Sequence, residues 1–204
     1  MKKKADLFSL VALLAALSLT APGQEKTEAV DRALDRTAPA QVEKADVPGI
    51  RNFSRVRGPA GFGGAMTGFG GATEPSAMAG LKKDGFKSVI NLRLASEPGA
   101  DVVGSRAAAE AAGLTYIHLP FDAENPDPRL VEGFFAAVGN TANHPVYIYC
   151  HSANRVGALW LITRVLKDGW AIDRAREEAV AIGLNAPAAE AFAVEYITAH
   201  PSAR

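Results

Sequence analysis

The sequence predicts an α/β fold, with a parallel-type central sheet of about four or five strands flanked by helices. The first observation behind this prediction is that short apolar runs alternate with segments of helical composition from Ser76 onward. The second is that glycine or proline marks the helix ends: Gly85 and Gly113 follow two helices, and Pro128 lies in the first turn of another. Strands that alternate with helices favour a parallel sheet covered on both faces.

The boundaries of the expected elements follow from the same pattern. Helices are expected at 76–84, 104–112, about 127–138, 154–167, 172–182 and 186–199. Strands are expected at 88–94, 114–121 and 146–149. Asp127 precedes Pro128 and is expected to cap its helix. Because ligands bind at the carboxyl ends of parallel strands, the residues that follow these strands are the candidates for a site.

The first residues have the composition of a targeting segment. Met1–Lys4 is basic, and Leu7–Thr20 is apolar apart from serines and a threonine. The apolar run is short for a membrane span, so we expect a signal peptide at 1–23, cleaved before Gln24, and a periplasmic or secreted protein. An uncleaved N-terminal anchor is the alternative.

Two further stretches differ from the α/β body. Residues 24–50 alternate charges with alanine and threonine, so we expect a disordered linker there and a folded domain at 51–200. The glycine-rich segment 58–71 lacks the Gly-Lys-Ser/Thr ending of a nucleotide-binding loop. We expect a flexible loop, with Phe62 and Phe69 packed onto the domain.

Composition narrows the range of partners. The 204 residues carry a formal net charge of zero, which gives no basis for attraction to nucleic acid. One cysteine and four scattered histidines cannot form a closed zinc site, so no metal or other cofactor is expected. After cleavage of the signal segment, we expect no stable association with a membrane.

The stretch from Val146 to Trp160 carries the candidate chemistry. The only cysteine, Cys150, ends a strand; a polar loop follows, and a helix begins near Asn154. Backbone N–H groups from His151 to Asn154 would form an anion site with the helix N-terminus, and Arg155 would add a planar, charged fork. The same field would stabilise the thiolate of Cys150, its nucleophilic form. A buried structural cysteine is the alternative.

A series of segments between Asn52 and Leu184 carries a resemblance to a known family. In order, they are Asn52–Val56, Gly85–Arg93, Leu119–Asp122, the loop Cys150–Arg155, and Gly169-Trp170 before an acidic helix. Together they resemble the cysteine-dependent phosphatase superfamily of tyrosine and dual-specificity phosphatases, and more narrowly a bacterial phosphatase-like family with a Cys-x4-Arg loop. The resemblance implies a phosphatase-like fold and the hydrolysis of phosphomonoesters, with a phosphorylated small molecule or phosphoprotein as substrate.

The resemblance also implies roles for residues of the loop. Cys150 would attack phosphorus and form a phosphocysteine intermediate, and Arg155 would hold the equatorial oxygens. The substrate would be bound by Arg155 together with the residues between it and the cysteine, which are His151, Ser152, Ala153 and Asn154.

An aspartate would protonate the leaving group in this mechanism. Asp122 is our first choice, because it lies just past the second predicted strand on a loop expected at the same sheet edge as Cys150. Glu124 and Asp127 on the same loop are the alternatives.

Departures from the phosphatase pattern keep other functions open. Four residues separate Cys150 from Arg155, whereas the phosphatase signature has five; Ala153 stands where related loops have glycine, and Val156 where Ser or Thr is frequent. The short loop also resembles that of rhodanese-type sulfurtransferases, in which Cys150 would carry a persulfide. A third alternative is a catalytically inactive module that binds an anion at this loop.

Overall fold

The computed structural model describes residues 42–56, 65–122 and 124–201. The predicted signal peptide, most of the predicted linker, and the part of the glycine-rich segment that contains Phe62 lie outside these residues. Export therefore stays a prediction. Within the described residues, no helix is both long enough and apolar enough to cross a membrane.

A sheet of six strands forms the centre of the described structure. The strands are β1 (Val42–Lys44), β2 (Ser54–Val56), β3 (Thr67–Gly70), β4 (Ser88–Asn91), β5 (Thr115–His118) and β6 (Val146–Tyr149). Their order in the sheet is β1-β2-β3-β6-β4-β5; the last four strands in that order run parallel, whereas β1, β2 and β3 pair antiparallel. The parallel core confirms the predicted fold class, and the additional strands come from β1, β2 and β3.

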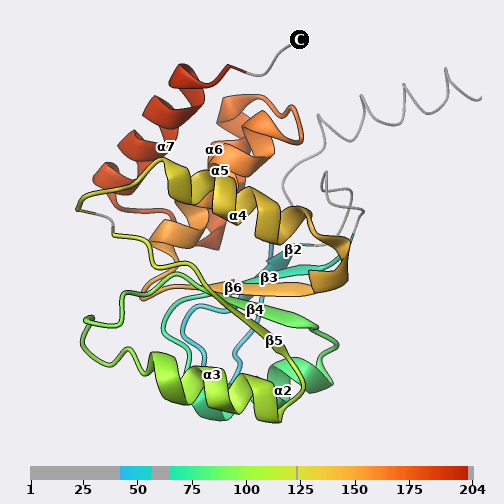
Figure 1. Ribbon diagram of the computed structural model, residues 1–204. Helices are drawn as coiled ribbons and strands as arrows, with labels where there is room; N and C mark the ends of the chain where they lie inside the picture. The colour runs from blue at the N-terminus through green and yellow to red at the C-terminus, as the bar shows by residue number, and fades with distance from the viewer. Residues whose placement is uncertain (1–41, 57–64, 123, 202–204) are drawn as a thin grey trace, which may run out of the picture. The chain divides into compact units, whose positions relative to one another are not determined.

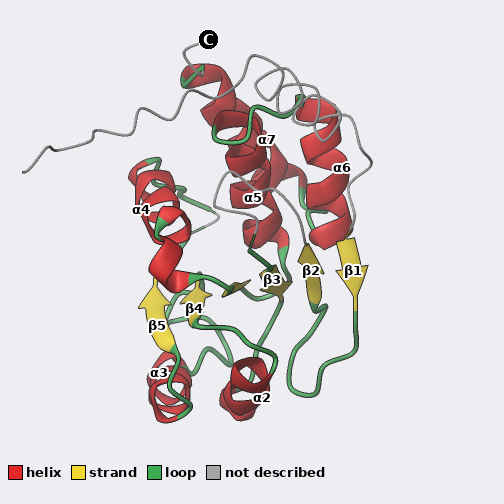
Figure 2. Cartoon of the chain, turned by 90° about the vertical axis from the view of Figure 1, so that its right-hand side faces the viewer, coloured by secondary structure: helices red, strands yellow, loops and turns green. Residues whose placement is uncertain are grey.

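Helices cover both faces of this sheet, as the alternating pattern predicts. They are α2 (Met78–Lys83), α3 (Val102–Ala111), α4 (Arg129–Gly139), α5 (Asn154–Leu166), α6 (Ile172–Ile182) and α7 (Pro187–Ala199), with short 3₁₀ helices at Pro75–Ala77 and Thr141–Asn143. Figure 1 shows α2 and α3 on one face and α4 to α7 on the other. Figure 2 shows the same layers after a quarter turn, with β1 and β5 at opposite edges of the sheet.

Strand β6 lies in the middle of the parallel part and is buried on both faces. Tyr147 and Tyr149 pack into the cluster formed with α2 and α3, whereas Val146 and Ile148 pack into the cluster formed with α4 to α7. This division follows from the alternation of side chains along a strand. Because β6 is central, Cys150 emerges in the middle of the carboxyl edge of the sheet.

The prediction of a flexible loop at 58–71 is wrong for the part that the structure describes. Thr67–Gly70 is strand β3, between β2 and β6. A Cβ atom on Gly68 would lie 2.6 Å from the ring of Phe86, so the missing side chain allows close packing rather than mobility. Phe69 is fully buried and packs edge-on against Trp160, which confirms its expected packing onto the domain.

The predicted linker extends too far, because the folded structure includes residues before 51. Val42–Lys44 forms β1, which pairs with β2, and Ile50 forms bridges with Val47 and Thr73. The prediction missed this strand because the stretch is rich in charged residues and has few apolar residues. Its strand is short and lies at the sheet edge, where exposed and charged side chains are usual.

Two of the observed strands are shorter than predicted: β4 ends at Asn91 and β5 at His118. Backbone hydrogen bonds continue beyond these ends in an irregular form. The N–H of Leu92 donates to the carbonyl of Tyr149 (2.9 Å), and the N–H of Phe121 donates to the carbonyl of Leu92 (3.0 Å). These bonds bring the segments after β4 and β5 next to the end of β6.

Candidate active site

The loop after β6 holds a buried thiol next to unused backbone donors. Cys150 is 1% exposed, and α5 begins at Asn154. Among the described residues, none accepts a hydrogen bond from the backbone N–H groups of His151 to Val156. The start of a helix adds partial positive charge to such donors. The loop can therefore offer several N–H groups to a single oxyanion.

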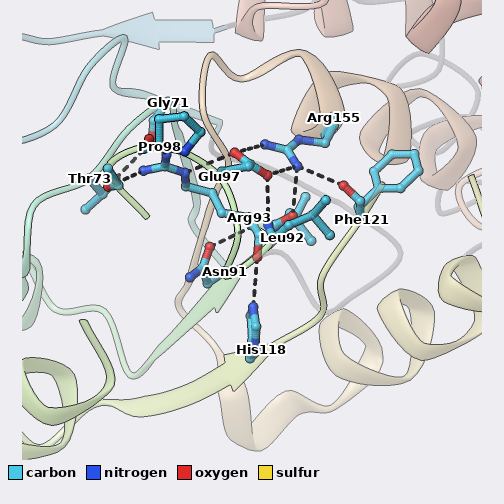
Figure 3. A network of polar contacts seen from close by, with 12 residues as sticks. Gly71, Thr73, Asn91, Leu92, Arg93, Glu97, Pro98, His118, Phe121 and Arg155 are labelled. Atoms are coloured by element: carbon cyan, nitrogen blue, oxygen red, sulfur yellow. Dashed lines mark hydrogen bonds and ion pairs between the residues drawn. The ribbon is translucent and has the colours of Figure 1, made fainter. Parts of the chain in front are cut away.

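Arg155 lies in the first turn of α5, and its guanidinium is anchored at one end. Nη1 donates to the carbonyl oxygens of Leu92 (3.2 Å) and Phe121 (2.8 Å) and to Oε1 of Glu97 (2.5 Å), and Nη2 donates to Oε2 of Glu97 (2.9 Å) (Figure 3). Among the described residues, no oxygen accepts a bond from its Nε–H. The Nε–H and the second N–H of Nη2 therefore stay available as a fork for an oxyanion.

The charge of Arg155 is coupled to the thiol. Burial alone would lower the pKa of Arg155, but its hydrogen bonds to Glu97 and the negative charge of the Cys150 thiolate raise it. The guanidinium therefore stays charged at the site. The structure thus brings the predicted nucleophile and the predicted oxyanion clamp together.

Glu97 is a residue of the site that the sequence-based prediction missed. Its carboxylate accepts bonds from Arg155, from the backbone N–H of Leu94 (2.7 Å) and from Nε of Arg93 (3.2 Å). Burial alone would raise the pKa of Glu97, but these bonds and the charge of Arg155 lower it to about 2. The one signal in the sequence is its place shortly after a predicted strand, at the edge where Cys150 is expected.

Of the candidate general acids, Asp122 is the one that interacts with Arg155. Asp122 accepts the backbone N–H of Glu124 (2.9 Å) and the side-chain amide of Asn125 (3.4 Å). The bond from Glu124 contributes most to lowering the pKa of Asp122, and the charge of Arg155 lowers it further. Asp122 is therefore ionised at neutral pH and has to take up a proton before it can act as an acid.

The other two candidates have different environments. Both carboxylate oxygens of Asp127 accept bonds from the guanidinium of Arg129, which lowers the pKa of Asp127. Oδ1 of Asp127 also accepts the backbone N–H of Arg129 (2.9 Å), so the expected contact with the helix start is present, although Pro128 occupies the N-cap position. Glu124 is exposed and contributes its backbone N–H to Asp122.

Side chains of the predicted substrate-binding residues mainly stabilise the loop. Oδ1 of Asn154 accepts the backbone N–H groups of Asn185 (2.6 Å) and Ala186 (2.7 Å), which ties the loop to the start of α7. Oγ of Ser152 accepts a bond from Nδ2 of Asn154 (3.1 Å), and His151 is exposed. What the loop offers an anion is therefore mainly its backbone N–H groups. Among the described residues, no cluster of His, Cys, Asp or Glu could hold a metal ion.

Ala153 adopts a left-handed backbone conformation with φ of 72°, which costs alanine about 1–2 kcal/mol. Its methyl group is backed by Gly183, where a Cβ atom would lie 2.7 Å from Cβ of Ala153 and 2.7 Å from Nδ2 of Asn52. Asn52 donates to the carbonyl of Ile182 (3.0 Å) and accepts a bond from Lys44 (2.8 Å). Strand β1 and the turn after α6 therefore support the strained residue.

Gly183→Ala is expected to displace the Cys150 loop, because the added methyl group would overlap Ala153 and Asn52 and because Gly183 has a positive φ. We expect a loss of roughly 1–3 kcal/mol in the free energy of unfolding and weaker protection of Cys150 by phosphate against alkylation. Ala153→Gly relieves strain without adding an atom and serves as the control that keeps both properties. Full protection in Gly183→Ala would contradict this support.

The Glu97 carboxylate makes stability depend on pH in the acid range. Its pKa of about 2 in the folded protein lies below the ordinary value of 4.5, so the unfolded chain takes up the proton first. The stabilisation is therefore complete above about pH 4.5 and is lost as the pH falls towards 2. Glu97→Gln should lack this part of the pH dependence when urea unfolding is followed through the acid range. Parallel curves for the two proteins would rule the coupling out.

Comparisons with known proteins fit this geometry. Residues 69–167 match the family model of the phosphatase-like domain of the beta-lactamase hydrolase-like protein. The matched range runs from β3 past the end of α5 and includes the Cys150 loop. None of the curated proteins compared with the chain matches it significantly.

Solved structures share the fold. A proposed phosphatase (DUF442) from Shewanella putrefaciens has a TM-score of 0.59 at 24% identity, over 75% of this chain and 95% of that one. TpbA from P. aeruginosa, solved as a Cys-to-Ser variant with phosphotyrosine, has a TM-score of 0.59 at 18% identity, over 81% and 93%. The catalytic core of the PP-IP phosphatase Siw14 from S. cerevisiae, solved with citrate, has a TM-score of 0.57 at 17% identity, over 74% and 88%. The matched segment and the shared fold make this α/β domain similar to phosphatase-like domains of the cysteine-dependent phosphatase superfamily.

Proposed function

We propose that the protein is an exported, cysteine-dependent phosphatase that hydrolyses phosphomonoesters through a phosphocysteine intermediate. The observation that carries this proposal is the combination of a buried thiol, a series of unbonded backbone N–H groups and the free edge of Arg155. These donors suit the three equatorial oxygens of a phosphoryl group in its transition state.

In the first step, the thiolate of Cys150 attacks phosphorus and an S–P bond forms. The P–O bond to the leaving group breaks, and its electron pair goes to the leaving oxygen. Protonated Asp122 supplies the proton that this oxygen needs, since its loop follows β5 and it interacts with Arg155. The loop N–H groups and Arg155 stabilise the charge on the oxygens that do not leave.

In the second step, water attacks the phosphocysteine. Asp122, now ionised, accepts a proton from this water, and the S–P bond breaks to release inorganic phosphate and the Cys150 thiolate. The hydrogen bonds that lower the pKa of Asp122 favour its ionised form, which is the form that this step uses first. Arg155 favours the return of the thiolate, because its positive charge stabilises a negative sulfur.

Two observations support a phosphorylated small molecule or a phosphoprotein as the substrate. Among the structural neighbours, TpbA was solved with phosphotyrosine and Siw14 is a PP-IP phosphatase. A hollow of about 440 Å³ also lies beside Asp122, lined in part by Pro120, Asn125 and Leu130. We assign this space to the leaving group, because the proton donor must lie next to the leaving oxygen.

Cys150→Ser is expected to abolish the hydrolysis of p-nitrophenyl phosphate, because the nucleophile is lost. Asp122→Asn should lower kcat by about 10²–10⁴-fold on an alkyl phosphate, whose leaving group needs a proton, and less on p-nitrophenyl phosphate. Asp127→Asn is the matched control, because Asp127 lies on the same loop but pairs with Arg129. Phosphate release over time measures all three variants.

Two outcomes would contradict these assignments. A loss of activity in Asp127→Asn with none in Asp122→Asn would move the acid role to Asp127. Thiocyanate formation from thiosulfate and cyanide, without phosphate release from any phosphomonoester, would replace phosphate hydrolysis by sulfur transfer at Cys150.

Export is part of the proposal and rests on the basic start and apolar run of residues 1–23. Expression of the full chain in a bacterium with a periplasm should yield a mature protein in the periplasmic fraction or the medium. N-terminal sequencing should place its first residue at Gln24. A protein found in the cytoplasm with residues 1–23 intact would exclude export.

A further inference from the structure

Arg93 is a buried cation close to the site. Among the described residues, no hydrogen bond or ion pair joins it to the Cys150 loop. Arg93 is 4% exposed. Nε donates to Oε2 of Glu97 (3.2 Å) and Nη2 to the carbonyl of Pro98 (2.7 Å) (Figure 3). Nη1 donates to the carbonyl of Gly99 (2.8 Å). All three nitrogens of its guanidinium are therefore used to hold the segment that follows β4.

The backbone of Arg93 is fixed as firmly as its side chain. Its N–H donates to Oδ1 of Asn91 (2.9 Å), and its carbonyl oxygen lies 2.8 Å from Nε2 of His118 on β5. The side chain therefore extends from a rigid point between two parallel strands. A side chain held at both ends can position the turn that it binds with little loss of its own freedom.

The turn that Arg93 holds also presents Glu97 to Arg155. Oε1 of Glu97 accepts the N–H of Leu94, which closes the turn, and the N–H of Glu97 donates to the carbonyl of Leu94 (3.2 Å). Both oxygens of Glu97 then meet Nη1 and Nη2 of Arg155. The orientation of the Arg155 fork is therefore connected to Arg93 through a single carboxylate.

The charges of Arg93, Glu97 and Arg155 are also linked. Glu97 carries one negative charge and is shared by two guanidinium groups, Arg93 and Arg155. The three groups together keep one net positive charge. An Arg155 paired alone with Glu97 would be neutralised, whereas the shared pair leaves a positive field for an oxyanion and a thiolate.

We propose that Arg93 is a positioning residue for oxyanion binding. It holds the turn Leu94–Gly99 so that Glu97 orients the Arg155 fork towards an oxyanion. The proposal rests on the oxyanion site of the proposed phosphatase but does not depend on turnover. It differs from a purely structural role, because its effect on binding must pass through Glu97.

A double-mutant cycle tests this dependence. Inorganic phosphate binding is measured as protection of Cys150 from iodoacetamide, at constant ionic strength, in the wild type, Arg93→Gln, Glu97→Gln and the double variant. We expect each single change to weaken phosphate binding roughly tenfold, and the double variant to be no weaker than Glu97→Gln alone. Additive losses in the cycle would overturn the proposal, because Arg93 would then act independently of Glu97.

Arg164→Gln is the matched control. Arg164 is also 4% exposed and pairs with two carboxylates, Glu178 (2.7 Å) and Asp168 (2.8 Å), but it packs between Trp160 and Trp170 away from the loop. Its loss should lower the unfolding midpoint and leave phosphate affinity within twofold. An equal loss of phosphate affinity in Arg164→Gln would overturn the proposal, because any buried arginine would then have the same effect.

If Arg93→Gln does not fold, Arg93→Lys replaces it in the double-mutant cycle with Glu97→Gln. Lysine keeps the charge but cannot bond to three acceptors in a plane, so we expect phosphate binding about threefold weaker than in the wild type, and no further loss when Glu97→Gln is added. Phosphate affinity equal to that of the wild type in Arg93→Lys would overturn the positioning role. A wild-type protein that binds phosphate but hydrolyses no phosphomonoester would contradict the proposed function alone.

Discussion

The partly buried ion pair between Glu97 and Arg155 is the interaction on which the geometry of the site depends. Removing a guanidinium from water costs several kcal/mol unless acceptors replace its hydration. Here the acceptors come from the segment after β4, through Leu92 and Glu97, and from the segment after β5, through Phe121. One cation on α5 thus connects the ends of two strands to the end of a third. Because only one end of its guanidinium is used, the same anchoring leaves an edge for a ligand.

Local signals are enough to predict much of the fold. The bounds of β6 and α6 agree with the prediction, and α5 and α7 each differ by a residue, since apolar runs and helix-ending residues are read along the chain. Strand β3, in contrast, is not predicted by local signals. Gly68 is in a strand because it makes room for Phe86, which lies elsewhere in the sequence. A glycine that serves packing across the sheet cannot be told from a loop glycine by local pattern.

The residues of the candidate site also fall into two groups: those that the local sequence indicates and those that only the order of the strands brings together. Cys150 and Arg155 can be proposed from the sequence because their spacing is local to one strand, loop and helix. Glu97 lies 58 residues from Arg155, and their contact exists because β4 and β6 are neighbours in the sheet. The side chain of Asn154 has a structural role for a similar reason, since its acceptor oxygen meets the backbone of Asn185 and Ala186. The order of strands, more than the motif, decides which charges meet.

The contacts of Lys44 and Asn52 show that residues far before the Cys150 loop in the sequence help to support it. Strand β1 contributes Lys44, which bonds to Asn52, and Asn52 supports Gly183 and Ala153 behind the nucleophile. A fragment that starts at Arg51 would keep every residue of the Cys150 loop but would lose the bond from Lys44 to Asn52, along with the strand that covers the open edge of β2. The folded unit therefore includes β1 at Val42–Lys44, upstream of residues 69–167 that match the family model. Its edge strand β1 is part of the support of the Cys150 loop.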